Sequence, residues 1–324
     1  MTFSVGYSAD PRIRWTEWLP WLAAIAVFFL LPDYLSLGAR ILTYMLFAVS
    51  LDLVLGYAGI ITLGHSAFFG LGAYVAGILA AKLGVTDPAL LLAAAACAAG
   101  VLGIATGAVI LRTQGLAQLM LTLAIAAVCL EIANKATSIT GGADGLSGIT
   151  IAPIFGTFKF DLFGKTAYLW CLVMLFGGWW LARRIIYSPF GATLSGIREN
   201  SVRMHAIGVP VYLRLVVVYT LSAMIAGVAG ALLTQTNQFV GLNVLGFEPS
   251  GELLVMLILG GVGRLYGAFV GPLVYLVAQD FLAKQFPEYW YFGIGLMLVL
   301  VVLFARGGIL GIADALITRL RSKT

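Results

Sequence analysis

The ionisable residues that could do chemistry in this chain lie inside strongly apolar segments. His65, one of two histidines, stands in "LGHSAFFGLGAYVAG" (63–77), where glycines and a serine interrupt a hydrophobic run. Asp52, Glu131 and Asp280 lie in or near other apolar runs. Ionisable groups inside a membrane segment are energetically costly, so they are candidates for a functional site.

The spacing of these residues does not match a catalytic or metal-binding motif. No other histidine or cysteine lies near His65 in sequence, which argues against a metal site. Acid–base or nucleophilic catalysis would need paired carboxylates or a serine–histidine arrangement. We therefore expect no enzyme activity, with His65 in a structural hydrogen bond. For Asp52 we favour capping a broken helix or bonding a neighbouring helix over contact with substrate, and we expect Glu131 and Asp280 to reach the outer interface.

The composition determines which elements must position these residues. The chain is 61% hydrophobic and only 10% charged, and its mean hydropathy is +1.02. Soluble domains carry about 45–50% apolar and about 25% charged residues. The composition therefore predicts an all-α, polytopic integral membrane protein embedded in the lipid bilayer. Its net charge of +5 fits basic residues on the cytoplasmic face better than it fits nucleic-acid binding.

Apolar runs near the length of a membrane span recur along the chain. We expect ten spans, at 19–37, 40–58, 64–82, 88–111, 116–134, 166–183, 213–235, 251–263, 267–283 and 288–306. The eighth is short and continues into "GGVGR", which is typical of a half-helix or part of a broken pair.

The basic residues predict the orientation of these spans. If both termini are cytoplasmic, every arginine except Arg40 lies in an inner segment or at its edge, whereas Lys323 is the only inner lysine. This bias follows the positive-inside rule. It places a long outer loop at 135–165 and a long inner loop at 184–212.

The inner loop carries the signals of two short helices. Ser188 followed by Pro189 is typical of a helix start, and Gly208 before Pro210 indicates a helix end. An internal glycine favours two helices that meet near 198–200, with Asn200 or Glu199 capping the second. The loop could be a plain connector whose arginines set the topology, but a capped hairpin outside the bilayer favours a docking element.

This loop resembles the coupling loop of ABC importer permeases, in particular the branched-chain amino acid permease family. The positions that fit the family pattern are Ser188, Pro189, Gly191, Ile197, Arg198, Glu199, Asn200, Ala206 and Gly208. Further similar segments are "LDLVLGYAGIITLGHSAFFGLGAY", "TGGADGLSGI", "LSAMIAGVAGAL" and "GGVGRLYGAFVGP". The outer-loop segment favours the M-type permease. The loop departs from the family pattern at Ala192, Gly196, Arg203 and His205.

The resemblance implies one permease domain over residues 1–324 in the inner membrane, which imports branched-chain or related amino acids by alternating access. Its expected partners are two cytoplasmic ATPase subunits that bind ATP, a second homologous permease and an extracytoplasmic solute-binding protein. We expect no cofactor in this chain. "KFDLFGKT" (159–166) ends like a phosphate loop but has Lys159 in place of the first glycine, which the backbone needs to enclose phosphate.

Glycines beside the intramembrane polar residues suggest a substrate pathway. Small residues allow helices to pack closely, and broken helices can expose backbone groups to a polar cavity. The candidate pathway residues are Asp52, Gly56, Gly59, Gly64 and His65.

Two alternatives to this function stay open. Permeases of similar appearance serve urea and amides, and a secondary transporter or channel for a small polar solute could also have ten spans. A secondary transporter would not need the inner hairpin.

Overall fold

The computed structural model describes residues 15–154, 158, 164–304 and 307–311. Within these residues the chain is helical, and its only β-pairing consists of two isolated bridges, Leu146 with Val240 and Ile154 with Phe158. The predicted all-α fold is therefore confirmed for the described chain. The two termini and most of "KFDLFGKT" lie outside the described residues.

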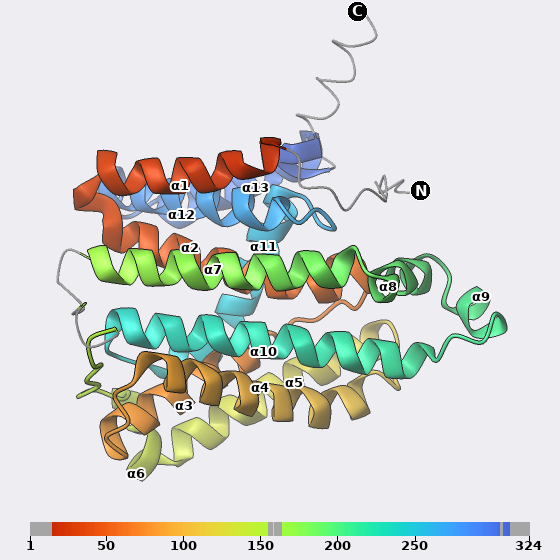
Figure 1. Cartoon of the computed structure of the whole chain (residues 1–324), viewed down its shortest axis with the longest axis horizontal. Coiled ribbons are helices and arrows are strands. Elements are labelled where there is room, and N and C mark those ends of the chain that lie inside the picture. The colour runs from red at the N-terminus through yellow and green to blue at the C-terminus, as the bar shows by residue number, and fades with distance from the viewer. Residues whose placement is uncertain (1–14, 155–157, 159–163, 305–306, 312–324) are drawn as a thin grey trace, which may run out of the picture.

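Each predicted span corresponds to one helix of the structure (Figure 1). These helices are α1 (Leu19–Leu30), α2 (Leu35–Asp52), α3 (Ser66–Lys82), α4 (Pro88–Ile110), α5 (Leu116–Lys135), α7 (Lys165–Ile186), α10 (Val211–Asn237), α11 (Phe247–Gly260), α12 (Gly267–Gln285) and α13 (Trp290–Phe304). The shorter elements are α6 (Thr137–Thr140), α8 (Pro189–Glu199), α9 (Ser201–Ala206), the 3₁₀ turns Trp15–Trp18, Pro32–Tyr34, Gly142–Asp144 and η5 (Leu242–Leu245), and the π-helical turn η3 (Leu53–Tyr57).

The described residues contain five helices long and apolar enough to cross a membrane. They are α2 with its flanking turns, α4, α5, α7 and α10. At 1.5 Å per residue, the 14 residues of α11 extend about 21 Å, less than the about 30 Å of a hydrocarbon core. The chain is a multi-pass membrane protein, and the count of ten full crossings stays a prediction.

Two predicted boundaries are wrong. The break between the first two spans lies at residues 31–34 rather than at 38–39, because Pro32 starts a 3₁₀ turn there and its ring prevents α1 from continuing. The eighth helix runs over 247–260 rather than 251–263. It ends at Gly261, whose φ of +115° favours glycine.

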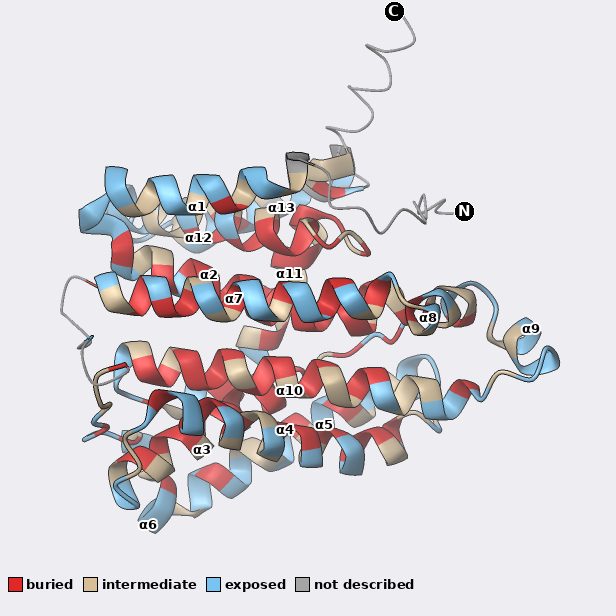
Figure 2. Ribbon diagram, in the orientation of Figure 1, coloured by how far each residue is buried: buried red, intermediate tan, exposed pale blue. Residues whose placement is uncertain are grey.

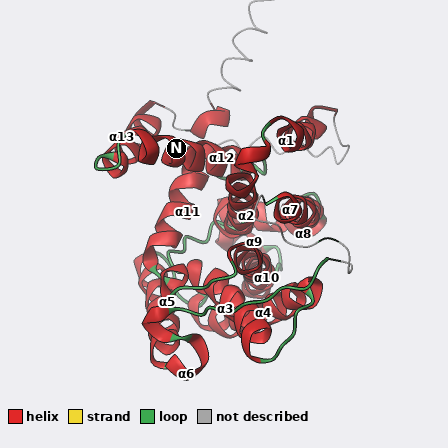
Figure 3. Cartoon of the chain, turned by 90° about the vertical axis from the view of Figure 1, so that its left-hand side faces the viewer, coloured by secondary structure: helices red, strands yellow, loops and turns green. Residues whose placement is uncertain are grey.

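The helices form layers around α2 and α10 (Figure 3). One outer layer holds α1, α12 and α13, and the opposite one holds α3, α4 and α5. Nearly all of α2 is buried between these layers (Figure 2). This explains why its polar residues must find partners inside the protein.

Glycines bring the backbones of α3 and α10 together. A Cβ on Gly72 would overlap the backbone of Gly227, and a Cβ on Gly230 would overlap the carbonyl of Phe69. Lipid provides no hydrophobic drive between helices, so such close approach contributes directly to their association. The glycines of α3 and α10 therefore allow the two backbones to pack closely.

The loops between successive helices lie at the two ends of the bundle, as the predicted topology requires. At one end, with α8 and α9, the hydroxyl of Tyr212 donates to the carbonyl of Ala108 at 2.8 Å. At the other end, the amide of Gln235 donates to the carbonyl of Pro88 at 2.9 Å, and Leu146 pairs with Val240. Following the predicted orientation, we refer to these as the inner and outer ends.

Candidate functional site

The inner loop forms the two-helix hairpin that the sequence predicts. Ser188 caps α8, its Oγ accepting the Gly191 N–H at 3.3 Å. Asn200, rather than Glu199, caps α9 by accepting the Arg203 N–H at 2.9 Å. Beyond α9, Gly208 adopts a φ of +85°, which residues with a Cβ rarely tolerate.

The hairpin has an anchored helix and a projecting one. Leu194 and Ile197 on α8 are buried, whereas α9 contains no buried residue. Two large apolar side chains at α9 are open to solvent, Val202 at 76% and Ile207 at 68% exposure. Figure 1 shows α9 at the far edge of the inner end. Large exposed apolar side chains on a projecting element are typical of an interaction surface.

The predicted coupling residues divide between these two environments. Gly191 and Ile197 are buried, and a Cβ on Gly191 would overlap the carbonyl of Ile186 at the end of α7. The others are exposed: Arg198, Glu199, Asn200, Ala206 and Gly208. Gly191 therefore fixes the junction between α7 and α8.

Arg198 differs from the other exposed residues because its guanidinium reaches back into the membrane domain. Its Nη1 donates a hydrogen bond to the carbonyl of Gly56. Its side-chain atoms also border the positions where Gly59 and Gly263 would carry a Cβ. Arg198 is thus a tether between α8 and the interior.

The tether reaches two neighbouring helix breaks. The first follows α2, where η3 ends and Gly59 turns the chain with a φ of +74°. The second lies between α11 and α12, where Gly261 and Gly263 have φ values of +115° and +77°. Irregular backbone at membrane depth is tolerated only where protein or water satisfies it, and π-helical turns often mark functional sites.

Asp52 joins these two breaks. Its Oδ1 accepts the Gly263 N–H at 2.7 Å, and Arg198 interacts with it electrostatically. Its Oδ2 is buried and has no hydrogen-bond partner among the described residues. Gly56 must lack a Cβ because Asp52 and the Gly263 amide occupy that space. Asp52 therefore bonds a neighbouring segment, which agrees with the structural role predicted for it.

His65 belongs to a separate buried cluster at the start of α3. Its Nε2 lies 2.9 Å from Ser50 Oγ and 3.5 Å from Ser222 Oγ. Ser50 Oγ donates to the Phe47 carbonyl and Ser222 Oγ donates to the Ser50 carbonyl. Each hydroxyl has one proton to donate, so Nε2 carries the ring proton. Nδ1 is then an acceptor with no partner among the described residues.

Gly64 has a packing role beside this cluster. A Cβ on Gly64 would overlap the carbonyl of Thr122 on α5, and the neighbouring Leu63 N–H donates to Thr122 Oγ1 at 3.3 Å. The five candidate pathway residues thus form two groups: Asp52, Gly56 and Gly59 at the helix breaks, and Gly64 with His65 at the α3 packing contact.

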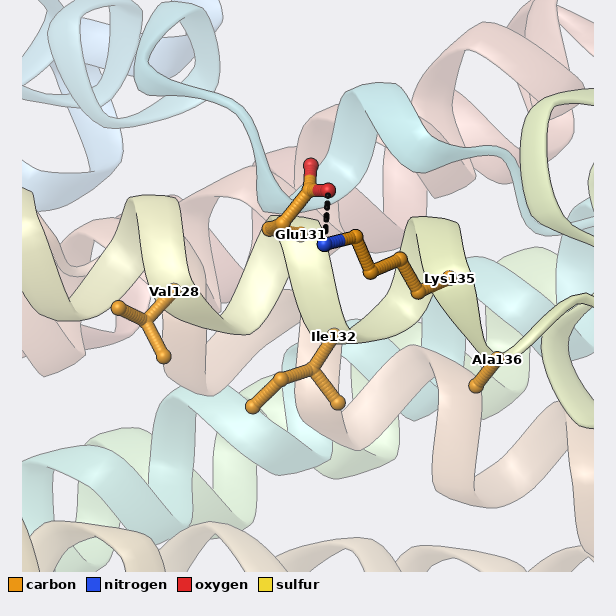
Figure 4. A pocket seen from close by; sticks show the side chains of 5 residues that line it. All are labelled: Val128, Glu131, Ile132, Lys135 and Ala136. Atoms are coloured by element: carbon orange, nitrogen blue, oxygen red, sulfur yellow. Dashed lines mark ion pairs between the residues drawn. The ribbon is translucent and has the colours of Figure 1, made fainter.

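The other predicted intramembrane carboxylates reach the outer end of the bundle. Glu131 pairs with Lys135 at 3.4 Å, and Figure 4 shows this pair beside Val128 and Ile132 in a shallow depression on α5. Asp280 pairs with Lys284 at 2.6 Å. Each pair is one helical turn apart, which satisfies both charges locally.

A third polar group was missed by the sequence analysis. It is drawn from α2, α11, α12 and α13 and consists of Arg40, Tyr44, Glu248, Glu252, Tyr275 and Tyr291. The available signals were the single arginine on the outer side and the two glutamates spaced four apart in an otherwise apolar stretch. Their proximity depends on helix packing that no local spacing indicates.

The described residues include no group of three or more His, Cys, Asp or Glu side chains placed to hold a metal ion.

These features define a class of protein. It is a multi-pass helical membrane protein with a helical hairpin at one end, and Arg198 of that hairpin reaches the helix breaks in the membrane domain. Residues 34–302 match the family described as "Branched-chain amino acid transport system / permease component". The chain belongs to this family, so the predicted resemblance is confirmed. Membership indicates a transport component rather than an enzyme.

Several curated permease proteins are similar to this chain over most of its length. LivM of Escherichia coli (strain K12), a high-affinity branched-chain amino acid transport system permease protein, is 25% identical over 288 residues, covering 82% of this chain and 67% of LivM. LivH of Salmonella typhimurium is 26% identical over 290 residues, covering 83% of this chain and 91% of LivH. BraD of Pseudomonas aeruginosa is 26% identical, covering 83% and 92%. No solved structure matches the chain.

Proposed function

We propose that this chain is one permease subunit of an ATP-binding-cassette importer for branched-chain or related amino acids in the inner membrane. Family membership supports the transport role. Two ATPase subunits bind and hydrolyse ATP beneath the inner end, and a second homologous permease completes the pathway. A solute-binding protein delivers substrate at the outer end. The M-type assignment stays a prediction because relatives named LivM and LivH have similar identities.

The observation that carries the coupling proposal is the tethered hairpin. The exposed apolar side chains of α9 provide a contact for the ATPase subunits, and Arg198 connects α8 to the break that follows α2. Force applied to α8 would therefore reach two helix breaks that Asp52 holds together. Rigid movement about these breaks is a physical route to alternating access.

An association assay tests the docking surface. We expect Val202→Glu to reduce co-purification of the cognate ATPase subunits by at least about tenfold, because a charge replaces an apolar contact. Val202 is 76% exposed, so the free energy of unfolding should change little. The matched control is Leu83→Glu, which changes a similarly exposed side chain at the outer end.

Retention of the ATPase subunits by Val202→Glu at wild-type level would contradict docking through α9.

The substrate is tested in proteoliposomes that contain the complete complex, comparing ATP-dependent uptake of leucine with that of urea and acetamide. Gradient-driven uptake by the purified chain alone would instead support a secondary transporter or channel.

A further inference from the structure

The outer half of the membrane domain contains charges of both signs that are not paired with each other. Arg40 lies on α2 and Glu252 on α11, and Arg40 interacts electrostatically with Glu252. Among the described residues, no ion pair within 4.0 Å joins Arg40 to a carboxylate. This contrasts with Glu131 and Asp280, which each have a lysine one turn away.

Buried tyrosines hold both charged side chains. The guanidinium carbon of Arg40 lies 5.8 Å from the centre of the Tyr44 ring, a cation–π contact. The hydroxyl of Tyr275 donates to Glu252 Oε1 at 3.4 Å. Tyr44 and Tyr275 are 8% and 4% exposed, Glu252 is half-buried and Arg40 is exposed. Arg40 and Glu252 thus pack against two buried tyrosines, and both charged side chains keep part of their surface open to solvent.

The depth of these groups indicates what they face. Arg40 and Glu252 each lie five residues from the outer end of their helix, about 7.5 Å along the axis. Charged side chains at such depth face protein or a water-filled path rather than lipid tails. In Figure 3, α11 lies between α5 and α13, with α2 and α12 beside it.

Local structure explains one neighbouring charge but not these two. Glu248 is in the first turn of α11, where a carboxylate complements the helix dipole, and the Tyr291 hydroxyl donates to it at 3.4 Å. Glu252 lies beyond that first turn. Arg40 and Glu252 interact electrostatically without forming an ion pair among the described residues, so one guanidinium and one carboxylate are available for the two charges of an α-amino acid.

We propose that Arg40 and Glu252 form a binding site for the zwitterionic backbone of an amino acid substrate on its way through the permease. Arg40 pairs with the substrate carboxylate, for which its planar guanidinium offers a bidentate fit. Glu252 pairs with the substrate ammonium, while the Tyr44 ring positions Arg40 and the Tyr275 hydroxyl positions Glu252. The inference rests on the proposed function and names where the permease itself contacts its substrate.

Equilibrium binding of tritiated leucine to the permease–ATPase complex in nanodiscs, without binding protein, tests this site. Unlabelled leucine, leucinamide and 4-methylpentanoate serve as competitors; leucinamide lacks the carboxylate and 4-methylpentanoate lacks the ammonium. The variants are Arg40→Gln and Glu252→Gln, with Arg40→Lys and Glu252→Asp as conservative versions. Glu131→Gln is the control because Glu131 is exposed and paired with Lys135.

We expect each glutamine variant to weaken leucine binding by at least about tenfold, with smaller losses in the conservative variants and none in Glu131→Gln. The preference for leucine over leucinamide should fall in Arg40→Gln only. The preference for leucine over 4-methylpentanoate should fall in Glu252→Gln only. A residue that merely supported the fold would not produce this matched pair of changes.

Leucine binding by both glutamine variants within about twofold of wild type would overturn the site, as would equal loss of all three ligands. Absence of leucine binding by the wild-type complex would also overturn it. ATP-dependent leucine uptake by the complete complex with its binding protein is measured separately. If the complete complex takes up leucine, the proposed function stands even when the binding results overturn the site. If the complete complex takes up no leucine, the proposed function itself is contradicted.

Discussion

At the residue scale, the buried polar side chains of this chain hold separate elements together through backbone groups. Asp52 accepts an N–H from the α11–α12 loop, Ser222 donates to the Ser50 carbonyl, and Thr234 donates to the Ala73 carbonyl at 3.0 Å. In a membrane domain these bonds replace the water that such groups would otherwise bind. Each is a local stabilising contact whose loss leaves a buried group unsatisfied.

The proton assignment of His65 gives a prediction at this scale. Glutamine places its amide N–H₂ near the position of Nε2, whereas asparagine is too short to do so. We expect His65→Asn to lower the free energy of unfolding by about 1–3 kcal/mol and His65→Gln to lower it less, measured by thermal unfolding in detergent. His205, which is exposed, is the control, and its two variants should match wild type. Equal losses for both His65 variants would contradict the Nε2–H tautomer.

At the element scale, the fold depends on helix pairs whose backbones nearly touch. The contact of α3 with α10 uses Gly72, Gly227 and Gly230, each placed where a Cβ would meet backbone or side-chain atoms of a neighbouring helix. Overpacking at a backbone contact cannot be relieved by a change of rotamer. This contact therefore limits how far α3 can shift relative to α10 during transport.

A pair of glycine variants tests that contact. Gly230→Ala should lower the free energy of unfolding by about 2 kcal/mol or more, because its Cβ would overlap the Phe69 carbonyl and the two helices must separate. Gly177→Ala on α7 is the control, since no atom lies within 4 Å of its added Cβ, and it should be neutral or slightly stabilising. Similar melting temperatures for the two variants would refute a tight α3–α10 contact.

Sequence patterns predicted the elements better than their contacts. Apolar runs located the helices, and Ser188, Asn200 and Gly208 located the hairpin, because caps and stops are local signals. Asp52 and Gly263 are 211 residues apart, and Arg40 and Glu252 are also distant in sequence, so no spacing could indicate their proximity. The α1–α2 boundary was wrong because apolar residues continue past Pro32. Only tertiary packing brings Asp52 near Gly263 and Arg40 near Glu252.

At the scale of the whole molecule, the inner and outer ends carry different polar networks joined by the buried α2. Arg40 lies near the outer end of α2, and the Asp52–Gly56 region lies at its inner end. α2 therefore contacts both the proposed substrate site and the tether to α8. A rigid helix with a break at one end can transmit movement between such sites, so we expect Arg198 to be the decisive residue for coupling.

We expect Arg198 to couple ATP hydrolysis to substrate uptake, although it is exposed like its neighbour Glu199. Arg198→Ala removes the bond to the Gly56 carbonyl but leaves the α9 surface unchanged. We expect ATPase subunits to bind this variant, and ATP hydrolysis to continue, while substrate uptake per ATP falls by about tenfold or more. Arg184→Ala is the matched arginine control, because Arg184 is exposed near the inner end of α7 and its guanidinium lies over the Trp180 ring of the same helix; this variant should keep normal coupling.

The double variant Arg198→Ala/Glu199→Ala separates the tether from surface charge. If the tether alone transmits movement, this variant should behave as Arg198→Ala does, since Glu199 forms no described bond into the membrane domain. Uptake and ATP hydrolysis are measured in the same proteoliposomes, so that their ratio is independent of protein amount. Fully coupled transport by the double variant would refute coupling through α8. Loss of ATPase binding by Arg198→Ala would instead show that docking itself depends on Arg198, which would contradict a tether that acts only in coupling.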